Sequence, residues 1–428
     1  MPLRVGVAGL GTVGVGTLEL LAENADLIAE RCGRRIEVTA VSSRERERDR
    51  GVDIAGMTWH DDAVALARDP DVDAVVELIG GSDGVALDLS RAALAGGKPL
   101  VTANKAMLAH HGAELAVAAE AAGVALGYEA AVAGGIPIIK ALREGLAANR
   151  VRRVFGILNG TCNYILSAMR DGGRDFAEVL AEAQQLGFAE ADPSFDVDGV
   201  DTAHKLAILA SVAFGCPVNF DAIHIEGIRH VTALDIDYAA ELGFDIKLLG
   251  VAALTDRGLE QRVHPCMISK DSPIAHVDGS FNAVYVDVDF ADRTMFVGRG
   301  AGAGPTASAV VADLIDIARG HRLPVFGKPA DALRPIAAAP MENHKGAYYI
   351  RLMVIDRPGV MADVTAALRD EQVSVEALLQ RGRNPGDVVP VVLTTHETDE
   401  AAMRRTLARI AEFDSVVEAP RMIRIERL

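Results

Sequence analysis

Apolar and polar positions follow two alternating periods in the first third of the chain. Short apolar runs with the length of buried strands occur at residues 3–8, 36–41, 73–79, 98–102 and 124–128. Between them, apolar residues recur every three or four positions, as on one face of a helix, beginning with residues 13–29. Strands that alternate with helices predict βαβ units and a parallel sheet. We therefore expect an α/β fold with a doubly wound, Rossmann-type sheet over residues 1–135.

The pattern changes in the middle of the chain. Helical stretches at residues 175–187 and 201–214 alternate with strand-like runs such as 282–290. This mixture predicts an α+β second domain over residues 136–325. Its last helix is expected at residues 306–319, and we expect that helix to pack back onto the first domain.

The last quarter of the chain contains a break and then a third pattern. Residues 326–346 are rich in proline and show little periodicity, so we expect a linker there. Residues 347–428 resume regular patterns, in the order strand, helix, strand, strand, helix, strand, at residues 348–356, 360–370, 373–379, 388–395, 399–412 and 421–426. This βαββαβ order predicts a ferredoxin-like domain.

Composition excludes several classes of function. The net charge of −17 opposes binding to nucleic acid, whose phosphates need a basic surface. The four cysteines are scattered and form no CxxC pair, so neither a disulfide framework nor a zinc site is indicated. The chain starts with a strand pattern instead of a signal peptide, and no uncharged apolar run is long enough to span a bilayer. We expect a cytoplasmic protein with no nucleic-acid or membrane partner.

A Gly-rich turn, GLGTVG, joins the first strand to the first helix. Gly9 permits a tight turn, Gly11 lets a pyrophosphate approach the backbone, and Gly14 lets helix and strand pack closely. The amides at the start of the helix then face the phosphates. Because a strand and a helix flank the motif at the start of a βαβ series, a dinucleotide site is favoured over a turn without a ligand.

The end of the second strand bears on the choice of dinucleotide. NAD-specific sites commonly place an acidic residue here, on the ribose 2′-hydroxyl, but this strand ends in Ser42-Ser43-Arg44. Arg44 could meet a 2′-phosphate, whereas the nearby Glu45 leaves NAD use open. The pattern favours NADP, with NAD as the alternative.

Acidic residues cluster ahead of a lysine in the block GFAEADPSFDVDGVDTAHKLAIL, which begins at Gly187. Asp201 and Lys205 are four residues apart and share one face of a helix, which by itself is typical of a solvated ion pair. Lys205, however, heads the apolar run LAILASVAF, so its helix is expected to be buried. A lysine at the edge of a core can reach the pKa range of acid–base catalysis. Carboxylates beside it would suit the ammonium group of a small zwitterionic substrate.

Lys105, in the segment VTANKAM, directly follows a strand of the first domain. Ligands of parallel sheets bind at this carboxyl edge. Taken alone, a loop lysine is usually solvated. The position nevertheless makes Lys105 a second candidate for the site.

Five segments together resemble homoserine dehydrogenases: GLGTVG, TANKAML, ILNGTCNYI from Ile157, GFAEADPSFDVDGVDTAHKLAIL and GRGAGAGPTASAVVADL. They occur in the family's order and span residues 1–325. The resemblance implies an NAD(P)-dependent oxidoreductase that interconverts homoserine and aspartate semialdehyde, in threonine, methionine and isoleucine biosynthesis. It also implies that the second domain carries catalysis, substrate binding and dimerisation, within a homodimer or homotetramer.

The resemblance assigns roles to individual residues. Lys205 maps onto the family's catalytic acid–base, and Lys105 maps onto a lysine near the nicotinamide and substrate. Substrate-binding carboxylates are expected at Glu190, Asp196 and Asp201. Cofactor contacts are expected at Gly9, Gly11, Thr12, Val13, Gly14, Arg44, Ala103, Lys105, Gly187 and Gly302.

The family also holds a monovalent cation, usually sodium, near the hinge between domains. The matching segment is EAAVAGGI, in which the ligands would come from Glu129, Val132, Gly134 and Ile136. One carboxylate and several backbone carbonyls are hard oxygen ligands that suit such an ion. A structural ion that fixes the hinge is favoured over a catalytic one.

The ferredoxin-like unit, with its DRPGV turn, resembles an ACT domain, a module that binds amino acids between copies. Amides at the start of its first helix suit a carboxylate, so Asp356, Gly359 and Val360 are expected to form a regulatory site. Threonine, the end product of the pathway, is the effector that the resemblance implies. The alternative is an appended module for stability or dimerisation, because a fold does not establish ligand binding.

Three competing functions are weighed against this one. Cys162 could be the thiolate nucleophile of an aspartate-semialdehyde dehydrogenase, although no histidine base stands beside it in the sequence. Another amino-acid or 2-hydroxy-acid dehydrogenase would commonly use a His–carboxylate pair, but His204 should point away from the face of Lys205. A non-catalytic sensor of cofactor and amino acids would have no need for two lysines and an acidic cluster.

Overall fold

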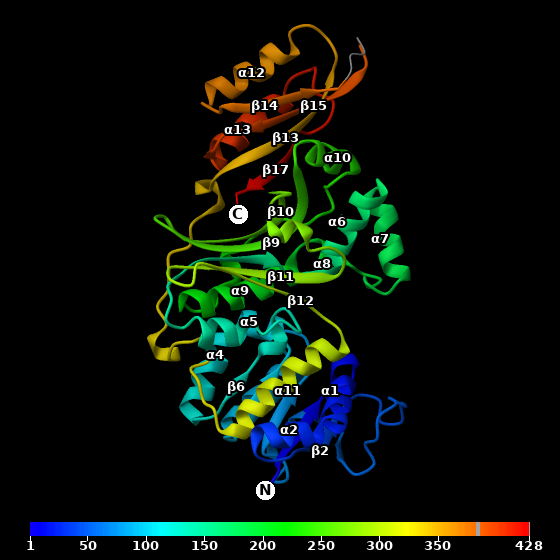
Figure 1. Ribbon diagram of the computed structural model, residues 1–428, viewed down its shortest axis with the longest axis vertical. Helices are drawn as coiled ribbons and strands as arrows, with labels where there is room; N and C mark the ends of the chain where they lie inside the picture. Colours follow the sequence, from blue (N-terminus) through cyan, green and yellow to red (C-terminus); the bar gives the residue numbers. More distant parts are fainter. Residues whose placement is uncertain (382–385, 428) are drawn as a thin grey trace.

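The computed structural model describes residues 1–381 and 386–427. The molecule is elongated, and its three parts follow one another along the long axis (Figure 1). The N-terminal sheet lies at one end, a second sheet crosses the middle, and the C-terminal unit lies at the other end. Within the described residues, no helix is both long and apolar enough to cross a bilayer.

The first sheet has six parallel strands in the order β3-β2-β1-β4-β5-β6. They are β1 (Leu3–Ala8), β2 (Ile36–Ser42), β3 (Thr58–His60), β4 (Ala74–Glu77), β5 (Leu100–Thr102) and β6 (Leu126–Gly127). The accompanying helices are α1 (Thr12–Glu23), α2 (Ala25–Cys32), α3 (Val85–Ala95) and α4 (Lys105–Ala122). The strand order reverses at β1, as in doubly wound folds, which confirms the predicted Rossmann-type sheet.

Two local predictions in this part were wrong. The helix expected at residues 13–29 is two helices, because Asn24 leaves the helical conformation at φ −104°, ψ 20°. Strand β3 was not expected, because its three residues, Thr-Trp-His, give no recognisable apolar run.

The middle part is built on antiparallel strands in the order β12-β11-β7-β9-β10. Its strands are β7 (Val151–Ile157), β8 (His224–Ile225), β9 (Phe244–Thr255), β10 (Gly258–Ser269), β11 (Phe281–Val288) and β12 (Arg293–Arg299). Its helices are α5 (Ile138–Lys140), α6 (Gly160–Gly172), α7 (Phe176–Gln185), α8 (Ser194–Val197), α9 (Val200–Phe214) and α10 (Ala233–Glu241).

Helix α9 is the central element of the molecule. It contacts β7, β9 and β10 on one side and α4 of the first part on the other (Figure 1). Its residues from Asp201 to Val212 are all buried. The helix therefore brings its charged first turns to the junction between the two sheets.

Helix α11 (Ala303–Arg319) returns the chain to the first part. It lies against α1, where Gly16 approaches the backbone of Ala303 so closely that a Cβ would be 3.0 Å from its carbonyl oxygen. The helix begins three residues before the expected start, and Pro305 occupies its first turn. Proline is tolerated there because the first-turn N–H groups have no partner within the helix.

The C-terminal unit has the predicted βαββαβ order. Its main elements are β13 (Lys345–Ile355), α12 (Val360–Asp370), β14 (Val375–Gln380), β15 (Val388–Thr395), α13 (Glu400–Ala411) and β17 (Arg421–Glu426), with a short β16 (Thr398–Asp399). Strand β17 pairs with β13 on one side and with β10 on the other. The two parts therefore share one eleven-stranded sheet, a continuity that the sequence did not predict.

Candidate active site

Two lysines from different parts of the chain meet at the junction between the two sheets. Lys105 begins α4 directly after β5, where Asn104 caps the helix by accepting from the Met107 N–H. Lys205 lies in the second turn of α9, which starts after Gly199 in the left-handed conformation (φ 86°). The contact between α4 and α9 brings the two side chains to one place.

Asp201 holds both lysines. Its Oδ1 lies 2.9 Å from Lys105 Nζ, and its Oδ2 lies 2.8 Å from Lys205 Nζ. Lys205 also donates to the carbonyl oxygen of Leu158 at 2.7 Å. Asp201 and Lys205 are 3% and 7% exposed, so the pair is not a solvated ion pair.

Asn159, which the sequence analysis did not single out, completes the cluster. Its Nδ2 donates to Asp196 Oδ1 at 2.7 Å and to Asp201 Oδ2 at 2.8 Å. The only signal in the sequence is an asparagine between a strand and a helix, which is typical of an N-cap. The residue does cap α6, by accepting from the Cys162 N–H.

The charges of the cluster shift one another's pKa values. Burial lowers the pKa of Lys205 below the ordinary lysine value, and Asp201 opposes that shift. Burial acts the same way on Lys105, but the carboxylate of Asp201 outweighs it, so the pKa of Lys105 is raised. The pKa of Asp196 is raised by burial and by the neighbouring Asp201. One lysine is thus poised to give up a proton while the other stays charged.

Glu190 and Gly187 lie outside this contact network. Both are exposed, in the segment between α7 and α8. Glu190 contributes to the negative field at Lys105 without a direct contact, and Gly187 adopts φ 77°. The structure therefore brings Lys105, Asp196, Asp201 and Lys205 together and leaves Glu190 at the rim.

The turn between β1 and α1 has the geometry expected of a phosphate-binding loop. Gly9 adopts φ 99°, and a Cβ at Gly14 would lie 2.0 Å from the carbonyl oxygen of Gly9. A Cβ at Gly11 would meet no atom within 4 Å, so the backbone there is open to a ligand. Thr12 and Val13 form the first turn of α1, whose free amides face the same space.

The other predicted cofactor contacts lie at the edges of the first sheet. Arg44 is exposed after β2, and Arg50 donates to Ser43 Oγ beside it. Ala103 accepts from the Lys105 N–H at 3.2 Å, at the carboxyl end of β5. Gly302 precedes α11 with φ 119°, a conformation that favours glycine.

The segment after β6 is buried and rich in oxygen atoms. Glu129 is 2% exposed, and its carboxylate accepts from the backbone N–H groups of Ile139 and Lys140. Burial and the adjacent Asp313 raise the pKa of Glu129 to about 7. Among the described residues, no hydrogen bond reaches the carbonyl oxygens of Val132 and Gly134, although both residues are buried.

Cys162 and His204 do not have the environment that the competing functions need. Cys162 is fully buried on α6, and burial raises the pKa of its thiol well above the ordinary value. The ring of His204 lies between those of His110 and Phe220, and burial lowers its pKa to about 4. Neither a ready thiolate nor a His–carboxylate pair is present among the described residues around Lys205.

The DRPGV turn leads into α12 through Gly359, which adopts φ 99°. Val360 is the first residue of the helix, and Asp356 precedes the turn at the end of β13, where its backbone pairs with residues 386 and 387. The amides of the first turn of α12 therefore stand after a glycine, as in other anion-binding turns.

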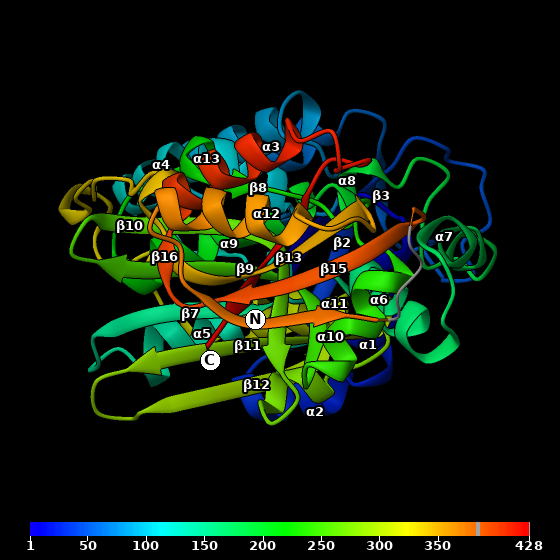
Figure 2. The ribbon, with the colours of Figure 1, turned by 90° about the horizontal axis from the view of Figure 1, so that it is seen from above.

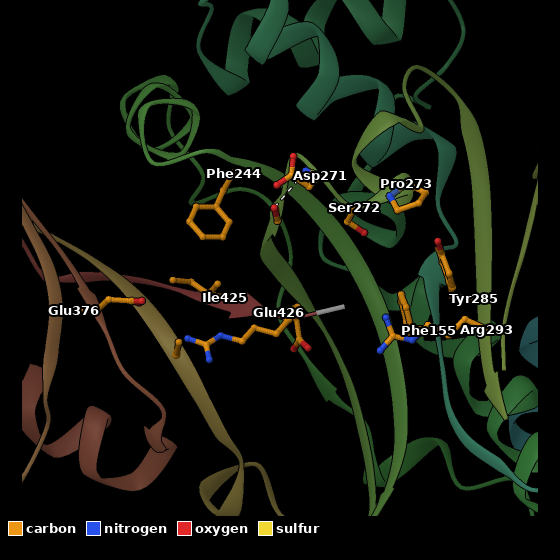
Figure 3. A pocket seen from close by; sticks show the side chains of 13 residues that line it. Phe155, Phe244, Asp271, Ser272, Pro273, Tyr285, Arg293, Glu376, Ile425 and Glu426 are labelled. Carbon is orange, nitrogen blue, oxygen red and sulfur yellow. Dashed lines mark hydrogen bonds between the residues drawn. The ribbon is translucent and has the colours of Figure 1, made fainter. Parts of the chain in front are cut away.

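A cavity of about 490 Å³ lies elsewhere, where the second sheet meets the C-terminal unit (Figure 3). Phe155 and Tyr285 line one side and Ile425 and Glu426 line the other. The lysine cluster does not border it. Its size therefore does not make it the site of the chemistry.

Comparisons with known proteins agree in all three parts of the chain. Family models match residues 9–129 ("Homoserine dehydrogenase, NAD binding domain"), 137–315 ("Homoserine dehydrogenase") and 348–412 ("ACT domain"). The homoserine dehydrogenases of Neisseria gonorrhoeae and Pseudomonas aeruginosa are each 46% identical, over 100% of this chain and 99% of theirs.

Solved structures show the same likeness. The crystal structure of a homoserine dehydrogenase from Thiobacillus denitrificans has a TM-score of 0.94 and 47% identity, covering 100% of this chain and 98% of that one. A hyperthermophilic archaeal homoserine dehydrogenase, solved in complex with NADPH, has a TM-score of 0.64 and 25% identity over 74% of this chain and 97% of that one.

Proposed function

The chain belongs to the homoserine dehydrogenase family, and on that premise we propose that it interconverts L-homoserine and L-aspartate 4-semialdehyde. The observation that supports this most strongly is the buried Lys205, held by Asp201 and the Leu158 carbonyl at the junction of the two sheets. The nicotinamide, when bound, supplies or accepts the hydride. The chain's own residues must bind the substrate and move one proton.

Lys205 is the proposed acid–base. An ammonium group has three N–H donors, and two of those of Lys205 are used by Leu158 and Asp201. The third is free for the substrate's oxygen. In homoserine oxidation, neutral Lys205 takes the hydroxyl proton; in aldehyde reduction, charged Lys205 returns it to the carbonyl oxygen.

The second lysine and the carboxylates orient the substrate. Lys105 stays charged beside Asp201 and stabilises negative charge on the substrate's oxygen. Asp196 and Glu190 attract the substrate's ammonium group, and Asp201 adds to the same field while it holds the two lysines. This arrangement suits a substrate with an ammonium group near an alcohol or aldehyde.

Replacement of Lys205 by alanine tests the proposal. We expect kcat for homoserine oxidation to fall by about 10²–10⁴, because the proton acceptor is lost. The KM for the cofactor should change little, because the turn at Gly9–Gly14 is remote in the chain and in the fold. Lys270→Ala, an exchange at an exposed lysine, is the matched control. Near-normal turnover of Lys205→Ala would refute the assignment.

For the cofactor, we propose a preference for NADP over NAD. No carboxylate directly ends β2, and Arg44 and Arg50 both lie beside Ser43, where a 2′-phosphate would bind. The archaeal relative solved with NADPH supports the same choice. The kcat/KM values with NADP and NAD, measured for the wild type and for Arg44→Ala, test it. The exchange should weaken NADP use selectively.

A monovalent cation, with Na⁺ as the first candidate, is proposed for the segment after β6. The carbonyls of Val132, Gly134 and Ile136 and the carboxylate of Glu129 would hold it. Two buried carbonyls without donors and two adjacent buried carboxylates, Glu129 and Asp313, fit a cation. The melting temperature should be higher in NaCl than in tetramethylammonium chloride of equal ionic strength, and Glu129→Gln should abolish the difference.

The C-terminal unit is proposed to sense an amino acid, with threonine as the first candidate. The amides after Gly359, with Asp356 and Val360, would bind its carboxylate and ammonium groups. Homodimers or homotetramers would bring two such units together. Threonine should change either the rate or the melting temperature of the wild type; if it changes neither, a role in stability or assembly is favoured.

A further inference from the structure

Asn159 uses every hydrogen-bonding atom of its side chain. Its Nδ2 donates one hydrogen to Asp196 and one to Asp201, and its Oδ1 accepts from the Cys162 N–H at 2.8 Å. The residue is 5% exposed, so water does not compete for these atoms. It is thus the neutral link between two buried carboxylates.

The link has an electrostatic purpose. Two carboxylates at one buried site repel each other, and one of them tends to keep a proton. The pKa of Asp196 is already raised by burial and by Asp201, and the hydrogen bond from Asn159 opposes that rise. An amide that donates to both carboxylates lets both remain charged without a shared proton.

Other residues that cap helices cannot do this. Serine, threonine and aspartate can accept the backbone N–H at an N-cap, but none of them can also donate two hydrogens. A simple cap would therefore leave the choice among these residues open. The two carboxylates at 2.7 and 2.8 Å require the amide.

We propose that Asn159 is a positioning residue for the reaction. It fixes Asp201 Oδ2, to which Lys205 is bonded, and it turns Asp196 towards the space for the substrate's ammonium group. Asn159 thereby sets both the proton affinity of Lys205 and the affinity for the amino alcohol. This inference rests on the proposed function.

The exchange Asn159→Asp separates positioning from capping. Aspartate caps a helix as well as asparagine does and has the same shape, but it donates no N–H and adds a negative charge. We expect kcat for homoserine oxidation to fall by about tenfold or more and the KM for homoserine to rise, because charged hydrogen bonds are lost. The acid limb of the pH profile should move to higher pH, because added negative charge favours charged Lys205. The KM for the cofactor should stay the same.

Asn159→Ser and Asn24→Asp complete the experiment. Serine keeps the cap without new charge, so kcat should fall while the acid limb does not move upward. Asn24→Asp makes the same amide-to-acid exchange between α1 and α2, and its kinetics should match the wild type.

The outcomes distinguish the two hypotheses. If the wild type does not oxidise homoserine, the proposed function fails. If the wild type is active and Asn159→Asp keeps its kcat, its KM for homoserine and its pH profile within about twofold, the inference fails, even when the melting temperature falls. Should Asn159→Asp not fold, unchanged kinetics of Asn159→Ser would overturn the inference equally.

Discussion

Asp201 is the residue on which the charge balance of the site depends. It is a buried carboxylate in contact with two ammonium groups, and these lysines hold its pKa well below the ordinary range in spite of burial. The sequence suggested that Asp201 would face the substrate's ammonium group. In the structure its oxygens are engaged by Lys105, Lys205 and Asn159, so its contribution to substrate binding acts through the field of the cluster.

The pH dependence of catalysis follows from this contact. Because burial lowers the pKa of Lys205, homoserine oxidation should rise with pH through an inflection below the ordinary lysine value of 10.5. Aldehyde reduction, which needs charged Lys205, should fall over the same range. In Asp201→Asn, the charge that raises the pKa of Lys205 is gone, so the inflection of the residual activity should move to lower pH. Rate profiles in both directions measure this, and a shift to higher pH would contradict it.

At the scale of elements, the Gly-rich turn contains two glycines that are required for different reasons. A methyl group at Gly14 would collide with the backbone of Gly9, which lies inside the turn. A methyl group at Gly11 would meet no protein atom and would extend into the space reserved for the pyrophosphate. One glycine serves the fold, and the other serves the ligand.

Alanine exchanges should separate these two requirements. Gly14→Ala should lower the melting temperature and weaken cofactor binding together, because the turn itself must move. Gly11→Ala should keep the melting temperature of the unliganded protein but weaken cofactor binding by about tenfold or more, equivalent to about 1.4 kcal/mol. Calorimetric titration and thermal unfolding without cofactor provide both readings. Equal melting losses in the two variants would contradict the distinction.

Periodicity could predict elements because it reports burial, and it failed where burial is not periodic. The strands of the first sheet and the βαββαβ order follow from apolar runs, whereas the break at Asn24 and the three-residue β3 do not. Within the site, charged side chains at helical spacing identified Asp201 and Lys205. The Leu158 carbonyl and the Asn159 amide could not be found this way, because their role depends on a contact between α6, α8 and α9 that spacing does not encode.

At the scale of the whole molecule, the shared sheet couples the C-terminal unit to the catalytic part. Seen from above, β13 and β17 run across the strands of the middle part (Figure 2). Arg424 of β17 is almost fully buried at this junction and donates to Glu226, after β8, and to Glu400, of α13. Glu226 is followed by Gly227, where a Cβ would lie 2.2 Å from the Val197 carbonyl of α8. The ion pairs of Arg424 thus lie one close contact from the segment that carries Asp196.

Loss of Arg424 should therefore destabilise the molecule strongly. Arg424→Met leaves Glu400 and Glu226 without their shared partner, and breaking a buried pair in this way costs about 3–5 kcal/mol. Arg404 contacts the same two carboxylates but is 49% exposed, so Arg404→Met should cost only about 0–1 kcal/mol. Urea unfolding of the two variants measures the difference, and equal midpoints would refute it.

The same ion pairs predict how stability depends on pH. Although burial raises it, hydrogen bonds from His224 and Arg424 hold the pKa of Glu226 below its ordinary value, and Arg262 holds that of Glu426 at about 2. A carboxylate whose pKa is lowered on folding stabilises the protein above its unfolded pKa, and that stabilisation is lost as the pH falls towards the folded value. The wild type should thus lose stability steadily on acidification below the ordinary glutamate pKa. In Arg424→Met this acid-side slope should be shallower, because Glu226 no longer has its cationic partner; an unchanged slope would show that the junction does not depend on this arginine.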